Sequence, residues 1–142
     1  MWWPWNRTRP PATDRAHRAG EWGEGEAARM LAKKGYRILG RRVRLGRRDE
    51  LDIVARHDDT LVFVEVKTRA SEDFGRPIEA LGRAQRRAQS RAALRYLNQL
   101  KQKPSYFRFD VVEVVGSEGG EPPEIRHIES AFTLDRGRRP RW

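Results

Sequence analysis

Asp52, Glu65 and Lys67 are the residues whose types and order point to chemistry. The last two stand inside the most apolar segment of the chain, Leu61–Thr68 (LVFVEVKT), where charged side chains are rare unless they are paired or bind something. Two neighbouring carboxylates attract a divalent cation, and Mg²⁺ prefers carboxylate oxygens while it keeps positions for water and a substrate phosphate. A lysine beside such an ion can orient a water molecule or neutralise charge on the phosphate.

A predicted β-hairpin brings the two acids together. Its strands, 50–56 and 61–68, flank a two-residue turn at Asp58-Asp59. In that register the acids are directly opposite and Lys67 faces Glu50, all on one side of the sheet. Opposed like charges destabilise a sheet, so the pair requires compensation. The alternative without chemistry is an ion pair between Lys67 and either Glu50 or the acid two residues before the lysine.

A third acid, Glu24, is expected to point in the same direction. A helix is predicted to begin at Thr13 or Asp14, which are good N-caps, and to stop at Gly35. Glu24 shares one face of that helix with small and apolar residues, namely Gly20, Ala27, Ala28 and Leu31. A carboxylate at the centre of an inward face is expected to serve a site.

These residues require a scaffold of α/β class, a mixed central β-sheet flanked by helices in the order α-β-β-β-α-β-β. The other predicted strands are 36–44, 106–115 and 125–128, and a long helix is predicted over 78–100. Its apolar stripe is expected to run through Leu81, Ala84, Ala88, Ala92 and Tyr96. The 142 residues fit one domain, 13–135, between a flexible basic and aromatic arm at 1–12 and a basic tail at 136–142.

The amino-acid composition indicates that the binding partner is a nucleic acid. The net charge is +10, and all but five of the 30 basic residues are arginine, which grips phosphate bidentately. The absence of cysteine excludes a disulfide scaffold, a thiolate zinc site and a cysteine nucleophile. No segment is apolar enough to span a membrane and no signal peptide is visible, so a cytoplasmic protein without membrane contact is expected.

The arginines cluster near the predicted site. The clusters that we expect to contact a phosphate backbone are Arg41, Arg42, Arg44, Arg47 and Arg48 before the second strand, Arg69 after the third, and Arg83, Arg86, Arg87 and Arg91 on the long helix. The three histidines lack metal-ligand spacing. Asp110 is expected to pair with Arg108 in a structural role.

The order of a helical acid, a strand Asp and a Glu-x-Lys resembles the PD-(D/E)-x-K nuclease superfamily. More closely, the chain resembles the YraN family of predicted endonucleases, which are related in fold to Holliday junction resolvases. The resemblance extends from about Gly20 to Phe132 and rests on these segments: Gly23-Glu24, Gly35-Tyr36-Arg37-Ile38-Leu39, Glu50-Leu51-Asp52-Ile53-Val54-Ala55, 61–69, Phe74-Gly75-Arg76-Pro77, Arg108-Phe109-Asp110-Val111-Val112 and His127-Ile128.

The resemblance implies that Asp52 and Glu65 bind Mg²⁺ or Mn²⁺, that Lys67 is the catalytic lysine and that Glu24 is an accessory acid. Two positions depart from the family pattern: Asp49 replaces a glycine, and Ala84, followed by Gln85, replaces a lysine.

The expected function is a metal-dependent endonuclease acting on DNA, in particular structured or branched DNA, and a resolvase-like task favours a homodimer. One alternative is a non-catalytic nucleic-acid-binding module that retains a nuclease fold. Another is an adaptor that docks an acidic protein.

Overall fold

One mixed β-sheet organises residues 12–134, the part of the chain that this computed structural model describes. Its strands lie side by side in chain order: β1 (Arg37–Leu45), β2 (Asp49–His57), β3 (Thr60–Arg69), β4 (Tyr106–Val115) and β5 (Glu124–Phe132). Only β3 and β4 are parallel, and a parallel pair needs a crossover connection. The crossover contains η1 (Pro77–Ala80) and α2 (Arg83–Gln99).

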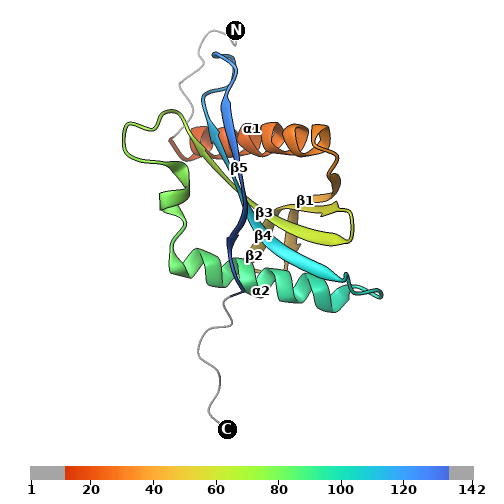
Figure 1. Cartoon of the computed structure of the whole chain (residues 1–142). Coiled ribbons are helices and arrows are strands. Elements are labelled where there is room, and N and C mark those ends of the chain that lie inside the picture. The colour runs from red at the N-terminus through yellow and green to blue at the C-terminus, as the bar shows by residue number, and fades with distance from the viewer. Residues whose placement is uncertain (1–11, 135–142) are drawn as a thin grey trace, which may run out of the picture.

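The sheet lies between α2 and the N-terminal helix α1 (Ala12–Lys33), as Figure 1 shows. Each helix covers its own apolar core. Ala27 and Leu31 of α1 pack with alternate valines of β3 and β4, whereas Ala92 and Ala93 of α2 pack with aromatic residues such as Phe63. Because side chains alternate along a strand, polar residues of neighbouring positions are directed toward different helices.

The predicted α-β-β-β-α-β-β order is therefore confirmed, with β1 at one edge of the sheet and β3 at its centre. Every residue of β3 from Leu61 to Lys67 is buried, as its continuous apolar pattern predicts. The predicted arm, apart from Ala12, and the predicted tail lie outside the described residues. Within residues 12–134, no helix is both long enough and apolar enough to cross a membrane.

The prediction of one uninterrupted helix over 78–100 is wrong. Pro77 begins a separate 3-10 turn, and α2 starts again after Gly82, whose extended backbone (φ −84°, ψ 174°) separates the two elements. Ala92 and Tyr96 of the predicted apolar stripe pack into the core under α2. Ala84 of the predicted apolar stripe is exposed, and the buried residues of the helix are Gln89, Ser90, Ala92 and Ala93.

The predicted last strand is too short, because β5 extends to Phe132. The first helix ends near its predicted residue, Gly35, which adopts the left-handed conformation (φ 92°) that favours glycine. At Gly23 the same helix approaches β3 closely. A Cβ atom at that position would lie only 1.9 Å from Thr68 Oγ1, so the glycine permits the contact that places α1 on β3.

Candidate active site

Asp52 and Glu65 meet where β2 and β3 begin to separate. The ladder between the two strands runs from the turn as far as Ile53 opposite Val64, which confirms the predicted register. At the next position the ladder stops, and the backbone N–H of Val66 donates a hydrogen bond to Asp52 Oδ2 at 2.9 Å. The carboxylate of Asp52 thus takes the place of a backbone acceptor, which holds it beside β3.

The carboxyl group of Asp52 is strongly perturbed. Burial and the negative charge of Glu65 raise its pKa to about 8, with further contributions from Glu24 and from a hydrogen bond with Glu65, although the N–H of Val66 acts in the opposite direction. With a pKa of about 8, Asp52 keeps its proton at neutral pH. A bound cation would remove the need for that proton.

Lys67 and two glutamines of α2 complete the surroundings of Glu65. The Lys67 Nζ atom lies 3.3 Å from Glu65 Oε1 and donates a hydrogen bond to Gln85 Oε1 at 2.8 Å. The Gln89 side chain donates to Glu65 Oε2 at 2.7 Å. Both oxygens of Glu65 are therefore engaged, and α2 orients the acid and the lysine together. Of the two ion-pair partners considered for Lys67, Glu65 is the one that it contacts, whereas Glu50 is exposed and lies 3.7 Å from Arg44 Nε.

Glu24 faces the sheet, as predicted, but an arginine holds it. Arg42 Nε donates to Glu24 Oε2 at 2.7 Å, and the same guanidinium donates to Glu21 Oε1 at 2.7 Å. These residues line a hollow of about 420 Å³ between α1 and the first two strands. In the described range 12–134, no three His, Asp or Glu side chains are gathered closely enough to form a metal-binding group. The structure thus brings Asp52 and Glu65 together and leaves Glu24 at their margin.

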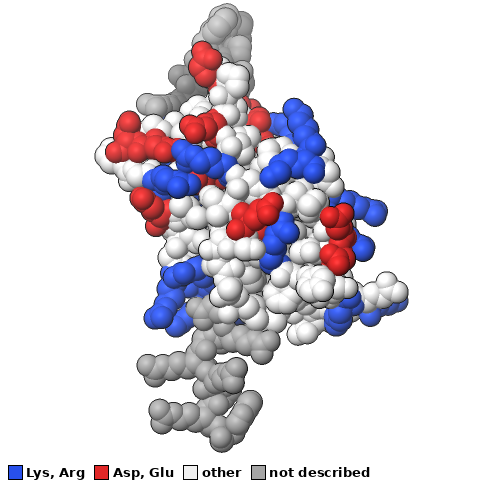
Figure 2. Space-filling view, viewed as in Figure 1, with Lys and Arg blue, Asp and Glu red and all other residues white. Residues whose placement is uncertain are grey.

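Most of the predicted phosphate contacts are exposed: Arg41, Arg44, Arg47, Arg48, Arg69, Arg83, Arg86 and Arg87. Arg42 and Arg91 are half-buried instead, because each is paired with carboxylates. On the face shown in Figure 2, basic residues gather over the N-terminal end of α2, whereas acidic and basic side chains alternate over the strands.

Asp49, the departure from the family glycine, has a structural reason. Its carboxylate accepts two hydrogen bonds from Arg91, at 2.9 and 3.2 Å, and it is only 4% exposed. The hydrogen bond from Arg91 lowers the pKa of Asp49 despite its burial. Arg95 reaches the carbonyl oxygen of Leu45 from the same helix. These contacts fasten the β1–β2 turn to α2, so Arg47 and the arginines of α2 lie on neighbouring surfaces.

The sequence analysis missed three supporting residues. Gln85 and Gln89 are one helical turn apart, a spacing that lets both reach the acid and the lysine from one side of α2, although Gln85 is exposed and only Gln89 is buried. Glu113 lies beside Lys67 in the sheet and is completely buried. It accepts hydrogen bonds from Arg76 and from the backbone of η1, which ties the crossover to β4.

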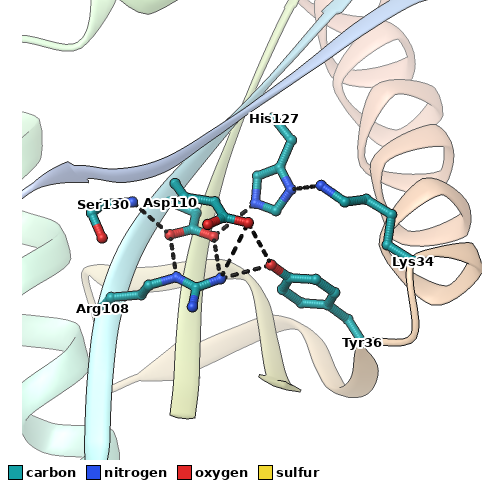
Figure 3. A network of polar contacts seen from close by, with 7 residues as sticks. Lys34, Tyr36, Arg108, Asp110, His127 and Ser130 are labelled. Carbon is teal, nitrogen blue, oxygen red and sulfur yellow. Dashed lines mark hydrogen bonds and ion pairs between the residues drawn. The ribbon is translucent and has the colours of Figure 1, made fainter. Parts of the chain in front are cut away.

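A second buried acid, Asp110, lies under the other helix (Figure 3). It accepts hydrogen bonds from Arg108 Nε at 3.0 Å and from the backbone N–H of Ser130 at 3.0 Å, and lies 2.7 Å from His127 Nε2. Lys34 contacts the other ring nitrogen of His127 at 2.7 Å. The predicted pairing of Asp110 with Arg108 is confirmed.

Fold and site together define a mixed α/β protein with two adjacent carboxylates, one buried and one half-buried, and a lysine at the end of its central strand. Its sequence matches the profile of the uncharacterised protein family UPF0102 over residues 23–114, a stretch that contains Glu24, Asp52, Glu65 and Lys67.

Individual relatives support the same family assignment. The UPF0102 protein of Symbiobacterium thermophilum is 44% identical over 117 residues, which cover 82% of this chain and 98% of the relative. That of Syntrophotalea carbinolica is 44% identical over 118 residues, 82% of this chain and 92% of the relative. That of Chlorobaculum tepidum is 43% identical over 120 residues, 81% of this chain and 92% of the relative. The chain belongs to the UPF0102 family, which is the YraN family.

Proposed function

We propose that this protein is a metal-dependent endonuclease that hydrolyses phosphodiester bonds of DNA, with structured or branched DNA as its substrate. The observation that carries the proposal is the pair of Asp52 and Glu65, whose mutual repulsion and burial raise the pKa of Asp52 to about 8 beside the ammonium group of Lys67. Structural ion pairs do not require two acids to face each other, whereas sites for hard cations do. The resemblance to the PD-(D/E)-x-K superfamily supports the same assignment.

The two acids fit Mg²⁺ or Mn²⁺, because they are oxygen ligands and the raised pKa of Asp52 means that a cation would displace its proton. When bound there, the ion would polarise a phosphate oxygen and lower the pKa of a water molecule. Gln89 holds Glu65 in one orientation, and the N–H of Val66 does the same for Asp52. Such supporting hydrogen bonds fix ligand geometry.

Hydrolysis forms a bond between water oxygen and phosphorus and breaks one P–O ester bond, and the departing oxygen takes up a proton. Lys67 is held at Nζ by Gln85 and Glu65, so its charge is placed beside the acids, where it can donate to a phosphate oxygen or hold the attacking water. Glu24 serves as the accessory acid once Arg42 turns to another anion. A phosphate of the DNA is such an anion.

The exposed arginines supply the DNA contacts. The β1–β2 turn, with Arg47 and Arg48, is fastened to α2 by the pair of Asp49 and Arg91, so two basic segments form adjacent surfaces. Contacts of this type position a backbone without reading the sequence of bases. A homodimer would supply two such sites for cutting two strands.

A non-catalytic nucleic-acid-binding module is the second candidate. It is favoured by one observation, the ion pair of Arg42 with Glu24, which leaves no group of three acids among the described residues. Such a module would keep the arginine surfaces and would bind DNA without hydrolysing it.

The test is Mg²⁺- or Mn²⁺-dependent cleavage of labelled four-way junction, flap, duplex and single-stranded DNA. Glu65→Gln preserves size and removes the charge, and Asp59→Asn, an exposed acid in the same hairpin, is the matched control. Cleavage that is lost in Glu65→Gln and kept in Asp59→Asn supports the nuclease. Tight binding without metal-dependent cleavage of any substrate favours the binding module. Weak DNA binding even at low salt contradicts both.

A further inference from the structure

A hollow of about 430 Å³ lies between the N-terminal half of α1 and the ends of β3 and β4. Figure 1 shows the turn between β4 and β5 beside this part of α1. The volume is within the range of small-ligand sites, and the carboxyl ends of parallel strands are where such sites form. The residues that matter for its chemistry are Arg15, Arg18, Trp22, Arg69, Gly116 and Glu118.

The floor of the hollow is aromatic and held in place. Trp22 is half-buried and packs against the core under α1, so one part of its indole faces the hollow and the rest is fixed. Gly116 has a φ of 151° and donates its N–H to the carbonyl oxygen of Arg69 at 2.9 Å. A Cβ atom at Gly116 would lie 3.5 Å from the Trp22 ring and 3.2 Å from the backbone of Pro123, so the glycine lets the turn approach the indole.

The rim is basic. Arg15 and Arg18 are exposed on consecutive turns of α1, and within residues 12–134 no carboxylate pairs with either of them. Arg69 is also exposed, and among the described residues its guanidinium group donates only to the carbonyl oxygen of Thr68, through Nη1 at 2.7 Å. The single acid at the rim, Glu118, is exposed. An aromatic floor under unpaired guanidinium groups matches a planar ring that carries a phosphate.

We propose that this hollow binds one nucleotide of a single DNA strand, with its base stacked on Trp22 and its phosphate held by Arg15, Arg18 and Arg69. Stacking on an aromatic ring tolerates any base, and arginine provides the fork that phosphate oxygens accept. The proposal deepens the proposed function, since it assigns a single-stranded segment to the DNA substrate. It rests on that function only for the identity of the nucleic acid, because binding here does not require hydrolysis.

Binding is measured by fluorescence anisotropy of a labelled single-stranded oligonucleotide and of the matching duplex, with EDTA present so that no cleavage occurs. We expect Trp22→Leu to weaken single-strand binding by roughly fivefold to a hundredfold, the effect of one lost base stack, and to leave duplex binding unchanged. Trp22→Phe retains an aromatic face and is expected to keep most of the affinity. Equal single-strand affinities of Trp22→Leu and wild type would overturn the proposal.

The rim is tested with surface variants that cannot disturb the core. Arg15→Gln/Arg18→Gln is expected to weaken single-strand binding several-fold. It should also reduce the slope of log K against log salt concentration by about 0.7 for each lost phosphate contact. Lys33→Gln/Arg37→Gln removes the same charge from exposed residues near the other end of α1 and is the matched control. Equal losses in both double variants would mean that net charge alone acts, which overturns a built site.

Two further results distinguish the ligand and the two proposals. Free dAMP and a trinucleotide are each used to displace the labelled oligonucleotide. If dAMP competes as well as the trinucleotide, the hollow binds a free nucleotide, which contradicts the proposal that it binds a DNA strand. If cleavage depends on Glu65 while Trp22→Leu binds normally, the nuclease stands and this hollow does not. If Trp22→Leu loses single-strand binding in a protein that never cleaves, the hollow stands and hydrolysis does not.

Discussion

Asp110, which is fully buried, and Asp52, which is half-buried, lie on the two sides of the sheet and have opposite electrostatics. Asp110, below the end of α1, is surrounded by donors, and the hydrogen bonds from His127, Arg108 and Ser130 outweigh its burial and lower its pKa. Asp52, toward α2, faces Glu65, and burial with that neighbouring charge raises its pKa to about 8. Burial is common to both, so the partners decide the direction. A chain rich in arginine neutralises one acid and leaves the other beside a second acid, which is the arrangement that a cation site requires.

The largest expected effect is a loss of stability when Asp110, the acid that is surrounded by donors, is removed. Asp110→Ala leaves Arg108 and His127 without their acceptor in a largely buried network. We expect the free energy of unfolding to fall by about 3 kcal/mol or more, as measured by urea denaturation. Asp59→Ala, in an exposed turn, is the control and should change it by less than about 0.5 kcal/mol. A loss below about 1 kcal/mol for Asp110→Ala would remove the contrast between the clusters.

Asp52→Asn is expected to act in the opposite direction. A raised folded-state pKa stabilises the protein below the unfolded pKa of about 4, and this contribution is lost as the pH rises toward 8. The amide keeps an acceptor for the N–H of Val66 and cannot ionise. At pH 8 without divalent ions, we expect the variant to be about 2 kcal/mol more stable than wild type.

Addition of Mg²⁺ or Mn²⁺ tests whether the raised pKa of Asp52 reflects a cation site. Wild type should gain thermal stability with the ion, since a ligand that binds the folded state stabilises it, and Asp52→Asn should gain little. Calorimetric melting curves at pH 8 measure both effects. A variant less stable than wild type at every pH would show that Asp52 is a structural acid like Asp110.

A smaller effect, on divalent-ion affinity, is expected for Gln89, which contacts one of the two acids. Gln89→Leu removes the hydrogen bond to Glu65 and retains an apolar contact with the core under α2. Loss of such an orienting partner should weaken divalent-ion affinity by roughly tenfold to a hundredfold, measured by calorimetric titration. Gln99→Leu, an exposed position near the end of the same helix, is the control. Unchanged affinity in Gln89→Leu would mean that α2 does not orient the site.

The smallest expected effect is the acid limb of the stability curve. Because the pKa of Asp110 is lowered in the folded state, its contribution is present above the unfolded pKa of about 4 and is lost as the pH falls through the folded value. Asp110→Asn should therefore flatten the fall in stability below pH 4, by at most about 1.4 kcal/mol per pH unit, the limit for one proton. An unchanged acid slope would mean that Asp110 titrates normally.

The parts of the site that depend on local geometry were predictable. The register of β2 and β3 follows from a two-residue turn, so Asp52 and Glu65 could be placed opposite each other from spacing alone. The face of Glu24 follows from the helical period. In each case the interacting residues lie close in sequence or share one element.

The parts of the site that depend on partners distant in sequence could not be predicted. Arg42 finds Glu24, and Arg91 finds Asp49 from 42 residues away, so neither arginine could be recognised as paired from its neighbours. The start of α2 depends on whether the chain continues through Gly82 as a helix, and the extended conformation of this one residue places Gln85 in the first turn of a new helix. A local pattern does not reveal such a break, because the partners of this segment are distant: the backbone N–H of Ile78 in η1 donates to Glu113, 35 residues away on β4.

The single parallel pairing has a consequence for the order of folding. Strands β1, β2 and β3 are joined by tight turns, so their contacts are local in sequence, whereas β4 can pair with β3 only after the whole crossover has been ordered. We therefore expect the hairpin that carries Asp52 and Glu65 to form before the Asp110 network, so that repulsion between the two acids slows an early step of folding. If the two acids bind a divalent ion as proposed, the ion should speed folding more than it slows unfolding, and the two arms of a chevron plot record that difference.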